Sequence, residues 1–180
     1  MRTTIDGAKT MKRWIPLLCV LLVLGCTSRK GVGKLGDAAQ PLTGLEWVKG
    51  GPVEIKPGTA YVIEFWATWC PPCRASIPHL TELQHKYKDR NLVVVGISTE
   101  KVNIVKPFVE KMGGEMDYAV AVDGTGAVDR GYMRAFGRNT IPSAFVVGPD
   151  GKLLWVGHPL DKMDAVLEKV LAGVSGAQGG

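Results

Sequence analysis

The chain has 180 residues, of which 46% are hydrophobic and 22% are charged. This length suits one ordinary domain rather than two, and the apolar content excludes an intrinsically disordered protein. The formal net charge is +5, but residues 26–180 hold 18 basic and 16 acidic residues and a net charge of only +2, which argues against a protein that binds nucleic acid.

The first 25 residues have the layout of a bacterial export signal. Two basic residues precede a run of ten apolar residues, 15–24, which is shorter than the roughly 20 that a membrane-spanning helix needs. The sequence VLGC at 23–26 resembles the lipobox of bacterial lipoproteins, in which the cysteine receives lipid. We expect a lipoprotein signal peptide at 1–25, translated from Met11, and a lipid anchor on Cys26. The alternative is a plain signal peptide with an unmodified Cys26.

The segments on either side of the expected domain are low in complexity. Residues 26–44 are small, polar and glycine-rich, which predicts a flexible linker, and residues 173–180 predict a disordered tail. The folded domain is therefore expected at 45–172. A lipid anchor would hold it at a membrane of the cell envelope, on the periplasmic side. Thr27 stands where some bacteria use aspartate to retain lipoproteins in the inner membrane, so the sequence favours the outer membrane.

Within the expected domain, hydrophobic patterns predict alternating strands and helices. Strands are expected at 61–66, 91–98, 117–122, 143–147 and 152–158, the last two joined by a turn at 148–151. Helices are expected at 72–88, 102–112, 127–136 and 163–171. Strand–helix–strand crossovers followed by a hairpin and a helix define an α/β fold with a central mixed sheet and helices on both faces.

The sequence Trp69-Cys70-Pro71-Pro72-Cys73 directly follows the first of these strands and opens a helix. A cysteine at a helix N-terminus faces free backbone N–H groups and the positive end of the helix dipole, and both favour the thiolate. The two prolines suit the first helical turn, where an N–H has no partner to lose. This placement predicts a redox-active pair formed by Cys70 and Cys73.

Two other uses of the cysteine pair are a zinc half-site and a structural disulfide. Zinc commonly needs a second close pair of ligands, whereas this sequence has no second CxxC and its three histidines are scattered, at His79, His85 and His158. A disulfide across so short a loop would constrain the unfolded chain little. We therefore expect no metal and no cofactor beyond the Cys70–Cys73 disulfide.

Residues 64–74, EFWATWCPPCR, resemble the active-site segment of thioredoxins, and FWATWCPPC resembles in particular their exported TlpA/ResA-type relatives. Pro78 matches the proline that kinks the active-site helix of that family, and residues 140–142 match its cis-proline loop. The residues around 101–122 exceed the minimal thioredoxin pattern, as in the TlpA/ResA branch with its central insertion. The resemblance spans 44–172 and implies a thioredoxin fold with that insertion.

The resemblance also implies roles for single residues. Cys70 is the expected attacking thiol and Cys73 the resolving thiol. Pro142, if cis, is expected to present the neighbouring backbone to an extended peptide, and the alternative is an ordinary trans-proline. The expected substrate contacts are Trp66, Trp69, Pro71, Pro72 and Ile141, although core packing is an equal alternative for the two tryptophans and Ile141.

Glu64 is the only charged residue of the strand 61–66 and stands where thioredoxins carry a buried acid. Strand alternation groups it with Val62 and Trp66, which favours burial over an exposed edge position. A buried carboxyl would have a raised pKa and could exchange a proton with Cys73. Several TlpA/ResA relatives place a glutamate where this chain has Ser76, which leaves a specific role in cytochrome c maturation open.

The expected function is that of a thiol–disulfide oxidoreductase, most simply a disulfide reductase for cell-envelope proteins with a role in cell redox homeostasis or cytochrome c maturation. The sequence has no nicotinamide or flavin fingerprint, so the expected electron donor is a membrane thiol-transfer protein. The alternatives are an envelope thiol oxidase or isomerase, a peroxiredoxin-like peroxidase and a non-catalytic lipid-tethered adaptor. A peroxidase of that kind would use a lone cysteine in a different loop.

Overall fold

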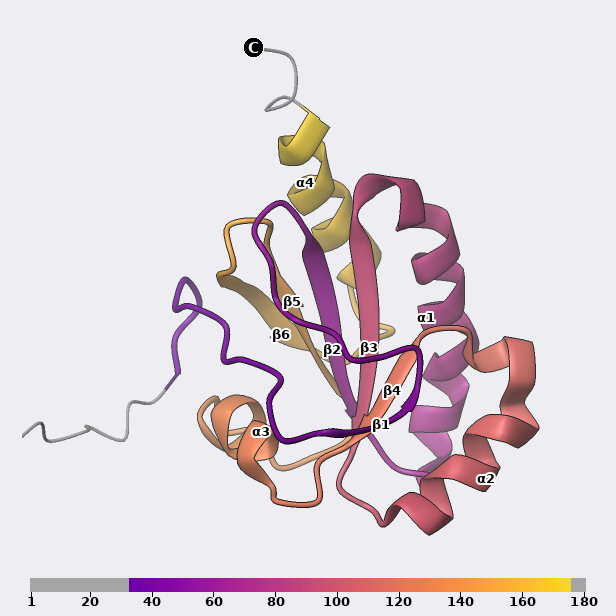
Figure 1. Cartoon of the computed structure of the whole chain (residues 1–180). Helices are drawn as coiled ribbons and strands as arrows, with labels where there is room; N and C mark the ends of the chain where they lie inside the picture. The colour runs from indigo at the N-terminus through magenta and orange to yellow at the C-terminus, as the bar shows by residue number, and fades with distance from the viewer. Residues whose placement is uncertain (1–32, 176–180) are drawn as a thin grey trace, which may run out of the picture.

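The computed structural model describes residues 33–175, which are built around one mixed β-sheet (Figure 1). Its strand order is β1-β4-β3-β2-β5-β6. The parallel strands β2, β3 and β4 lie side by side, and β1, β5 and β6 pair antiparallel to their neighbours. The strands are β1 (Glu46–Lys49), β2 (Ala60–Trp66), β3 (Leu92–Ser98), β4 (Ala119–Val122), β5 (Ser143–Val147) and β6 (Leu153–Gly157).

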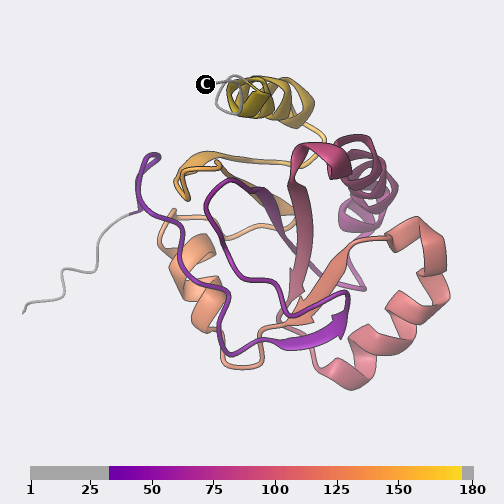
Figure 2. The ribbon, with the colours of Figure 1, turned by 45° about the horizontal axis from the view of Figure 1, so that its top comes forward.

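Helices cover both faces of this sheet (Figure 2). The cluster of buried residues on one face joins the sheet to α1, α2 and α4, and the cluster on the other face joins it to α3 and the chain before β1. The α-helices are α1 (Pro71–Tyr87), α2 (Val102–Met112), α3 (Ala127–Asp129) and α4 (Met163–Ser175). Short helical turns are η1 (Lys88–Arg90), η2 (Gly113–Met116) and η3 (Arg130–Arg134).

Strand β2 lies between β3 and β5, and all seven of its residues are buried. Side chains alternate across a strand, so Val62 and Trp66 join the cluster under α1, whereas Ile63 and Phe65 join the cluster under α3. A strand buried on both faces explains the nearly continuous apolar run in the sequence. It also forces Glu64, which shares the face of Val62 and Trp66, into the interior beside α1.

The observed elements confirm the predicted α/β fold with a mixed central sheet, and each predicted strand and helix has a counterpart. Two local features differ from the expectation. Strand β1 was not predicted, because four residues at a sheet edge carry too little hydrophobic pattern. The expected helix at 127–136 has only one α-helical turn in α3 and continues as the π-helical turn η3.

The expected linker at 26–44 is wrong for its second half, because residues 33–44 pack on the domain. Their backbone pairs with the edge of β6, where Gly36 N donates to Leu153 O at 2.7 Å and Leu153 N donates to Asp37 O at 2.9 Å. The side chain of Leu42 is buried among the residues near α3. Composition alone suggested a flexible segment, since backbone pairing at a sheet edge leaves no hydrophobic period in the sequence.

Truncation of the Leu42 side chain tests this attachment. Leu42 is 6% exposed, so Leu42→Ala is expected to lower the free energy of unfolding by about 2 to 3 kcal/mol in urea titrations of the full chain. Leu35 lies in the same segment but is 56% exposed, and Leu35→Ala should change stability by less than about 0.5 kcal/mol. Equal small effects from both variants would mean that the segment is not held on the domain in solution.

The predictions for the ends of the chain are only partly covered by the structure. Helix α4 extends to Ser175, so residues 173–175 belong to a helix and not to the expected disordered tail. The signal peptide at 1–25, the lipid anchor at Cys26 and residues 176–180 lie outside the described residues and stay predictions. Within residues 33–175, no helix combines the length and the apolar character that crossing a membrane requires.

Candidate active site

Cys70 and Cys73 lie where the carboxyl end of β2 leads into α1, and a disulfide joins them. Cys70 is the N-cap of α1, and its Sγ accepts a hydrogen bond from Cys73 N at 3.3 Å. Pro71 and Pro72 occupy the first helical positions, as predicted. Cys70 is 2% exposed and Cys73 is fully buried. The helix start therefore offers a backbone N–H to the sulfur of Cys70, which lowers the cost of a negative charge there.

A second loop, which leads into β5, lies beside Cys70. The Ile141–Pro142 peptide bond is cis, which confirms the predicted isomer. The carbonyl oxygen of Ile141 lies 3.9 Å from Cys70 Sγ, so the backbone before Pro142 borders the reactive sulfur. Because β5 pairs antiparallel with β2, the start of β5 lies beside the end of β2, and the sheet holds this loop next to the start of α1.

The residues expected to contact substrate separate into a surface group and a core residue. Trp69 is 69% exposed, Pro71 and Pro72 are also exposed, and Ile141 is half-buried. Trp66 is buried and packs on Phe108 of α2, with ring centroids 5.4 Å apart. The structure therefore brings Trp69 to the surface beside the cysteines and keeps Trp66 beneath it.

Glu64 is fully buried on the α1 face of β2, which confirms the predicted burial. Removal of the carboxyl from water raises its pKa from 4.5 to about 8, and the hydrogen bond from Ser76 opposes part of that rise. The acid is therefore mostly protonated at neutral pH. This protonation state fits a group that exchanges a proton near neutrality.

Ser76 connects Glu64 to the backbone of Cys73. Its Oγ lies 2.8 Å from Glu64 Oε1 and 2.8 Å from the carbonyl oxygen of Cys73. A serine hydroxyl has one proton and cannot donate to both acceptors at once. A protonated Glu64 removes the conflict, because its own O–H can donate to Ser76 while Ser76 donates to Cys73. The geometry of Ser76 therefore agrees with a carboxyl that is protonated in the resting state.

Glu100 is a site residue that the sequence did not indicate. It follows β3 and accepts two hydrogen bonds from Thr68, from the backbone N at 2.6 Å and from the side-chain Oγ1 at 2.8 Å. Ser98 donates to the same carboxylate at 3.3 Å. These contacts fix the loop between β2 and Cys70. The only signal in the sequence is an acidic residue just after a predicted strand. Charged residues at strand ends are too common for this signal to identify a site.

Among residues 33–175, no group of three or more histidine, cysteine, aspartate or glutamate side chains could hold a metal ion. Two of the three histidines pair with carboxylates instead. His79 Nε2 lies 3.0 Å from Asp164, and His85 Nε2 lies 2.8 Å from Asp117.

Sequence relatives carry names that match this geometry. Thiol-disulfide oxidoreductases named ResA from Bacillus thuringiensis subsp. konkukian and Bacillus cereus are each 29% identical over 110 residues, which cover 59% of this chain. The chain spans about 60% of the length of these curated relatives. The protein FixW from Rhizobium leguminosarum is 27% identical over 148 residues, or 77% of this chain and 66% of FixW. The ResA relatives confirm the resemblance to the ResA type.

Solved structures confirm the thioredoxin fold. A thiol:disulfide interchange protein of the thioredoxin family from Chlorobium tepidum superposes with a TM-score of 0.57 at 29% identity, covering 77% of this chain and 98% of that one. The thioredoxin domain of a thiol-disulfide oxidoreductase from Bacteroides vulgatus gives a TM-score of 0.65 at 22% identity, covering 77% and 99%. The model of the AhpC/TSA family matches residues 38–156, and the chain belongs to this thioredoxin-like family.

Proposed function

We propose that this chain is a thiol–disulfide oxidoreductase that works through Cys70 and Cys73. One observation carries the proposal: a cysteine pair joined by a disulfide begins helix α1, with the Ile141–Pro142 backbone beside Cys70. The related proteins with ResA and thiol:disulfide interchange names support the same chemistry. Trp69 and the exposed prolines 71 and 72 border the pair and are the proposed contacts for a protein substrate.

The reaction starts from the reduced pair. The Cys70 thiolate attacks one sulfur of a partner's disulfide, so that a mixed disulfide forms and the partner's other sulfur leaves as a thiolate. Cys73 then gives its proton to the carboxylate form of Glu64, which is the minority form at neutral pH because burial raises the pKa of Glu64 to about 8. The Cys73 thiolate attacks the sulfur of Cys70. The Cys70–Cys73 bond forms, and the bond from Cys70 to the partner breaks. The partner gains two electrons, and its two thiolates take protons from water.

The direction of electron flow is proposed as reduction of the partner. Disulfides persist outside the cytosol without assistance, so a reductant there has a use that an additional oxidant lacks. We further propose that the chain acts in the cell envelope, held to the membrane by lipid on Cys26, and receives its electrons from a membrane thiol-transfer protein. Apocytochrome c and wrongly oxidised envelope proteins are the proposed substrates.

The reduction potential of the Cys70–Cys73 pair tests this direction. Equilibration of the purified chain with defined thiol buffers should give about −200 mV or lower, toward the thioredoxin end of the scale. A value near about −120 mV would mean a thiol oxidant or isomerase and would overturn the assigned direction. Consumption of peroxide at a catalytic rate by the same preparation would instead support a peroxidase. A chain whose pair exchanges with no disulfide would be an adaptor.

A further inference from the structure

Three buried side-chain atoms on the α1 face of the sheet have no hydrogen-bond partner among the described residues. They are Glu64 Oε2, Trp66 Nε1 and the hydroxyl of Tyr118. Buried polar atoms are nearly always paired, because an unpaired one loses its contact with water and gains nothing in return. Three such atoms on one face, one of them on the proposed proton acceptor, call for an explanation.

Gly96 of β3 provides the space in which these side chains meet. It is the register partner of Glu64, so the two residues lie on adjacent strands at the same level of the sheet. A Cβ at Gly96 would lie 3.0 Å from Trp66 Nε1 and 3.1 Å from Tyr118 Cε2. The indole N–H and the hydroxyl-bearing edge of the tyrosine ring therefore lie over Gly96, next to the strand position of Glu64.

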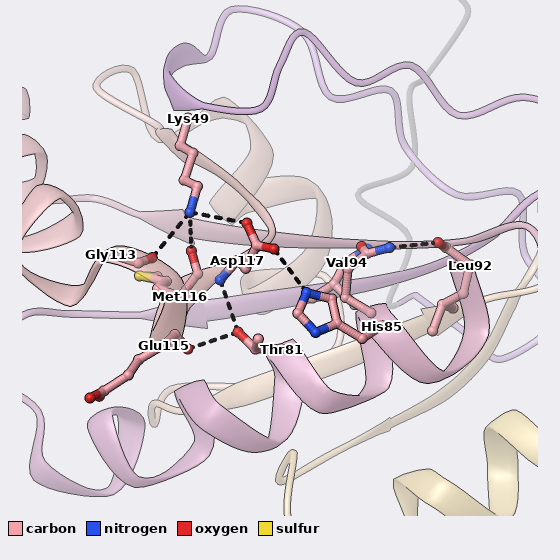
Figure 3. Close-up of polar contacts among 10 residues, drawn as sticks. Lys49, Thr81, His85, Leu92, Val94, Gly113, Glu115, Met116 and Asp117 are labelled. Atoms are coloured by element: carbon pink, nitrogen blue, oxygen red, sulfur yellow. Dashed lines mark hydrogen bonds and ion pairs between the residues drawn. The ribbon is translucent and has the colours of Figure 1, made fainter. Parts of the chain in front are cut away.

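The backbone that carries Tyr118 is fixed by a polar network at its preceding residue (Figure 3). Asp117 N donates to Thr81 Oγ1 of α1 at 2.9 Å, and Thr81 Oγ1 donates to Glu115 O at 2.8 Å. The Asp117 carboxylate lies 3.4 Å from Lys49 Nζ and 2.8 Å from His85 Nε2. Lys49 also donates to the carbonyl oxygen of Met116 at 2.7 Å. Contacts on both sides of the chain thus hold the approach to β4, and with it the start of the Tyr118 side chain.

When Glu64 ionises, its second carboxylate oxygen needs a hydrogen-bond donor, and Tyr118 can supply one. In the carboxylate form, Oε1 accepts from Ser76, but Oε2 is a buried charged oxygen without a donor. Burial and the nearby charge of Glu64 both raise the pKa of Tyr118 well above its usual value, so its hydroxyl keeps its proton and remains a donor. The O–H of a tyrosine can turn between two orientations in the plane of its ring, whereas the N–H of Trp66 has a fixed direction.

We propose that Tyr118 is a positioning residue whose hydroxyl donates to Oε2 of the ionised Glu64 and stabilises the carboxylate that accepts the Cys73 proton. This inference rests on the proposed function, because it concerns the proton acceptor of the resolving step. The proposal also explains why residue 96 is a glycine, since a side chain there would push Tyr118 and Trp66 away from the acid.

The test is the pH profile of the resolving step in Tyr118→Phe. The reduced chain is mixed with dithiobis(nitrobenzoate). Attack of Cys70 releases the first thionitrobenzoate, and attack of Cys73 on the mixed disulfide releases the second. Loss of a hydrogen bond to a charged group should slow this release about tenfold at neutral pH and shift its profile toward alkaline pH by about one unit. A purely structural role predicts a superimposable profile, and that result would overturn the proposal.

Tyr132→Phe is the matched control. Tyr132 is buried on the opposite face of the sheet, and its hydroxyl donates to Gln40 O at 2.6 Å. This variant should lose some stability and keep the wild-type pH profile. A shift of equal size in both variants would mean a general response to tyrosine loss and would also overturn the proposal.

A second measurement needs no variant at Tyr118 and no exchange activity. With ring-labelled tyrosine, the infrared C–O stretching band of one tyrosine should shift as Glu64 ionises in the wild-type chain, and this shift should be missing in Glu64→Gln. No shift in the wild type would overturn the proposal even if Tyr118→Phe failed to fold. A wild-type chain that releases no second thionitrobenzoate would refute the proposed function, and the infrared titration would still report on Tyr118.

Discussion

Replacement of Cys70 by serine is expected to reduce thiol–disulfide exchange to the uncatalysed rate. Cys70 is the N-cap of α1 and borders the Ile141 carbonyl, so it is the sulfur that an incoming substrate meets first. A serine hydroxyl at this position cannot form a disulfide and is a far weaker nucleophile than a thiolate. The measurement is the rate of reduction of a protein disulfide, followed by mass spectrometry of the chain and its substrate.

Cys73→Ser is the informative companion of this variant. Cys70 can still attack, but the mixed disulfide has no thiol to resolve it, so the chain and its substrate should accumulate as a covalent pair. In envelope extracts, the same variant should retain its natural partners. If Cys73→Ser were inactive and Cys70→Ser formed the trapped pair, the assigned roles of the two cysteines would be reversed.

Much of the fold was predictable because its signals are local. The continuous apolar run at 91–98 predicted a strand covered on both faces, and β3 is such a strand, between β2 and β4. The periodic apolar residues of α2 and α4 predicted those helices within a few residues. Strand β1 and the attachment of residues 33–44 depend on backbone pairing with distant strands, which leaves no pattern in the sequence.

The residues of the site also separate into those with a local sequence signal and those that depend on long-range contacts. The cysteine pair, the buried acid at Glu64 and the cis bond before Pro142 all lie in motifs whose sequence is informative by itself. The residues that support these groups lie outside any such motif. Glu100 and Tyr118 come from later parts of the chain, and only the sheet register brings them to the loop before Cys70 and to the acid. A single sequence gives no indication of such long-range partners.

Glu64→Gln is expected to slow the resolving step about a hundredfold at neutral pH, because a glutamine amide cannot accept the proton of Cys73. The same change is expected to stabilise the fold. The Glu64 carboxyl ionises near 4.5 in the unfolded chain but only near 8 in the folded chain, so the folded state holds an extra proton between these values. The contribution of Glu64 to wild-type stability is therefore greatest below about pH 4.5 and falls as the pH rises toward 8.

The neutral amide removes this loss, so Glu64→Gln should be more stable than the wild type by about 3 kcal/mol at neutral pH, with little difference under acidic conditions. Urea titrations across the pH range measure the difference. Glu82→Gln is the control, since Glu82 lies exposed on α1 and should keep both the wild-type rate and the wild-type pH dependence. A slow but unstabilised Glu64→Gln would indicate a carboxylate that is already ionised in the fold. A stabilised variant with an unchanged rate would leave the buried acid without a part in proton transfer.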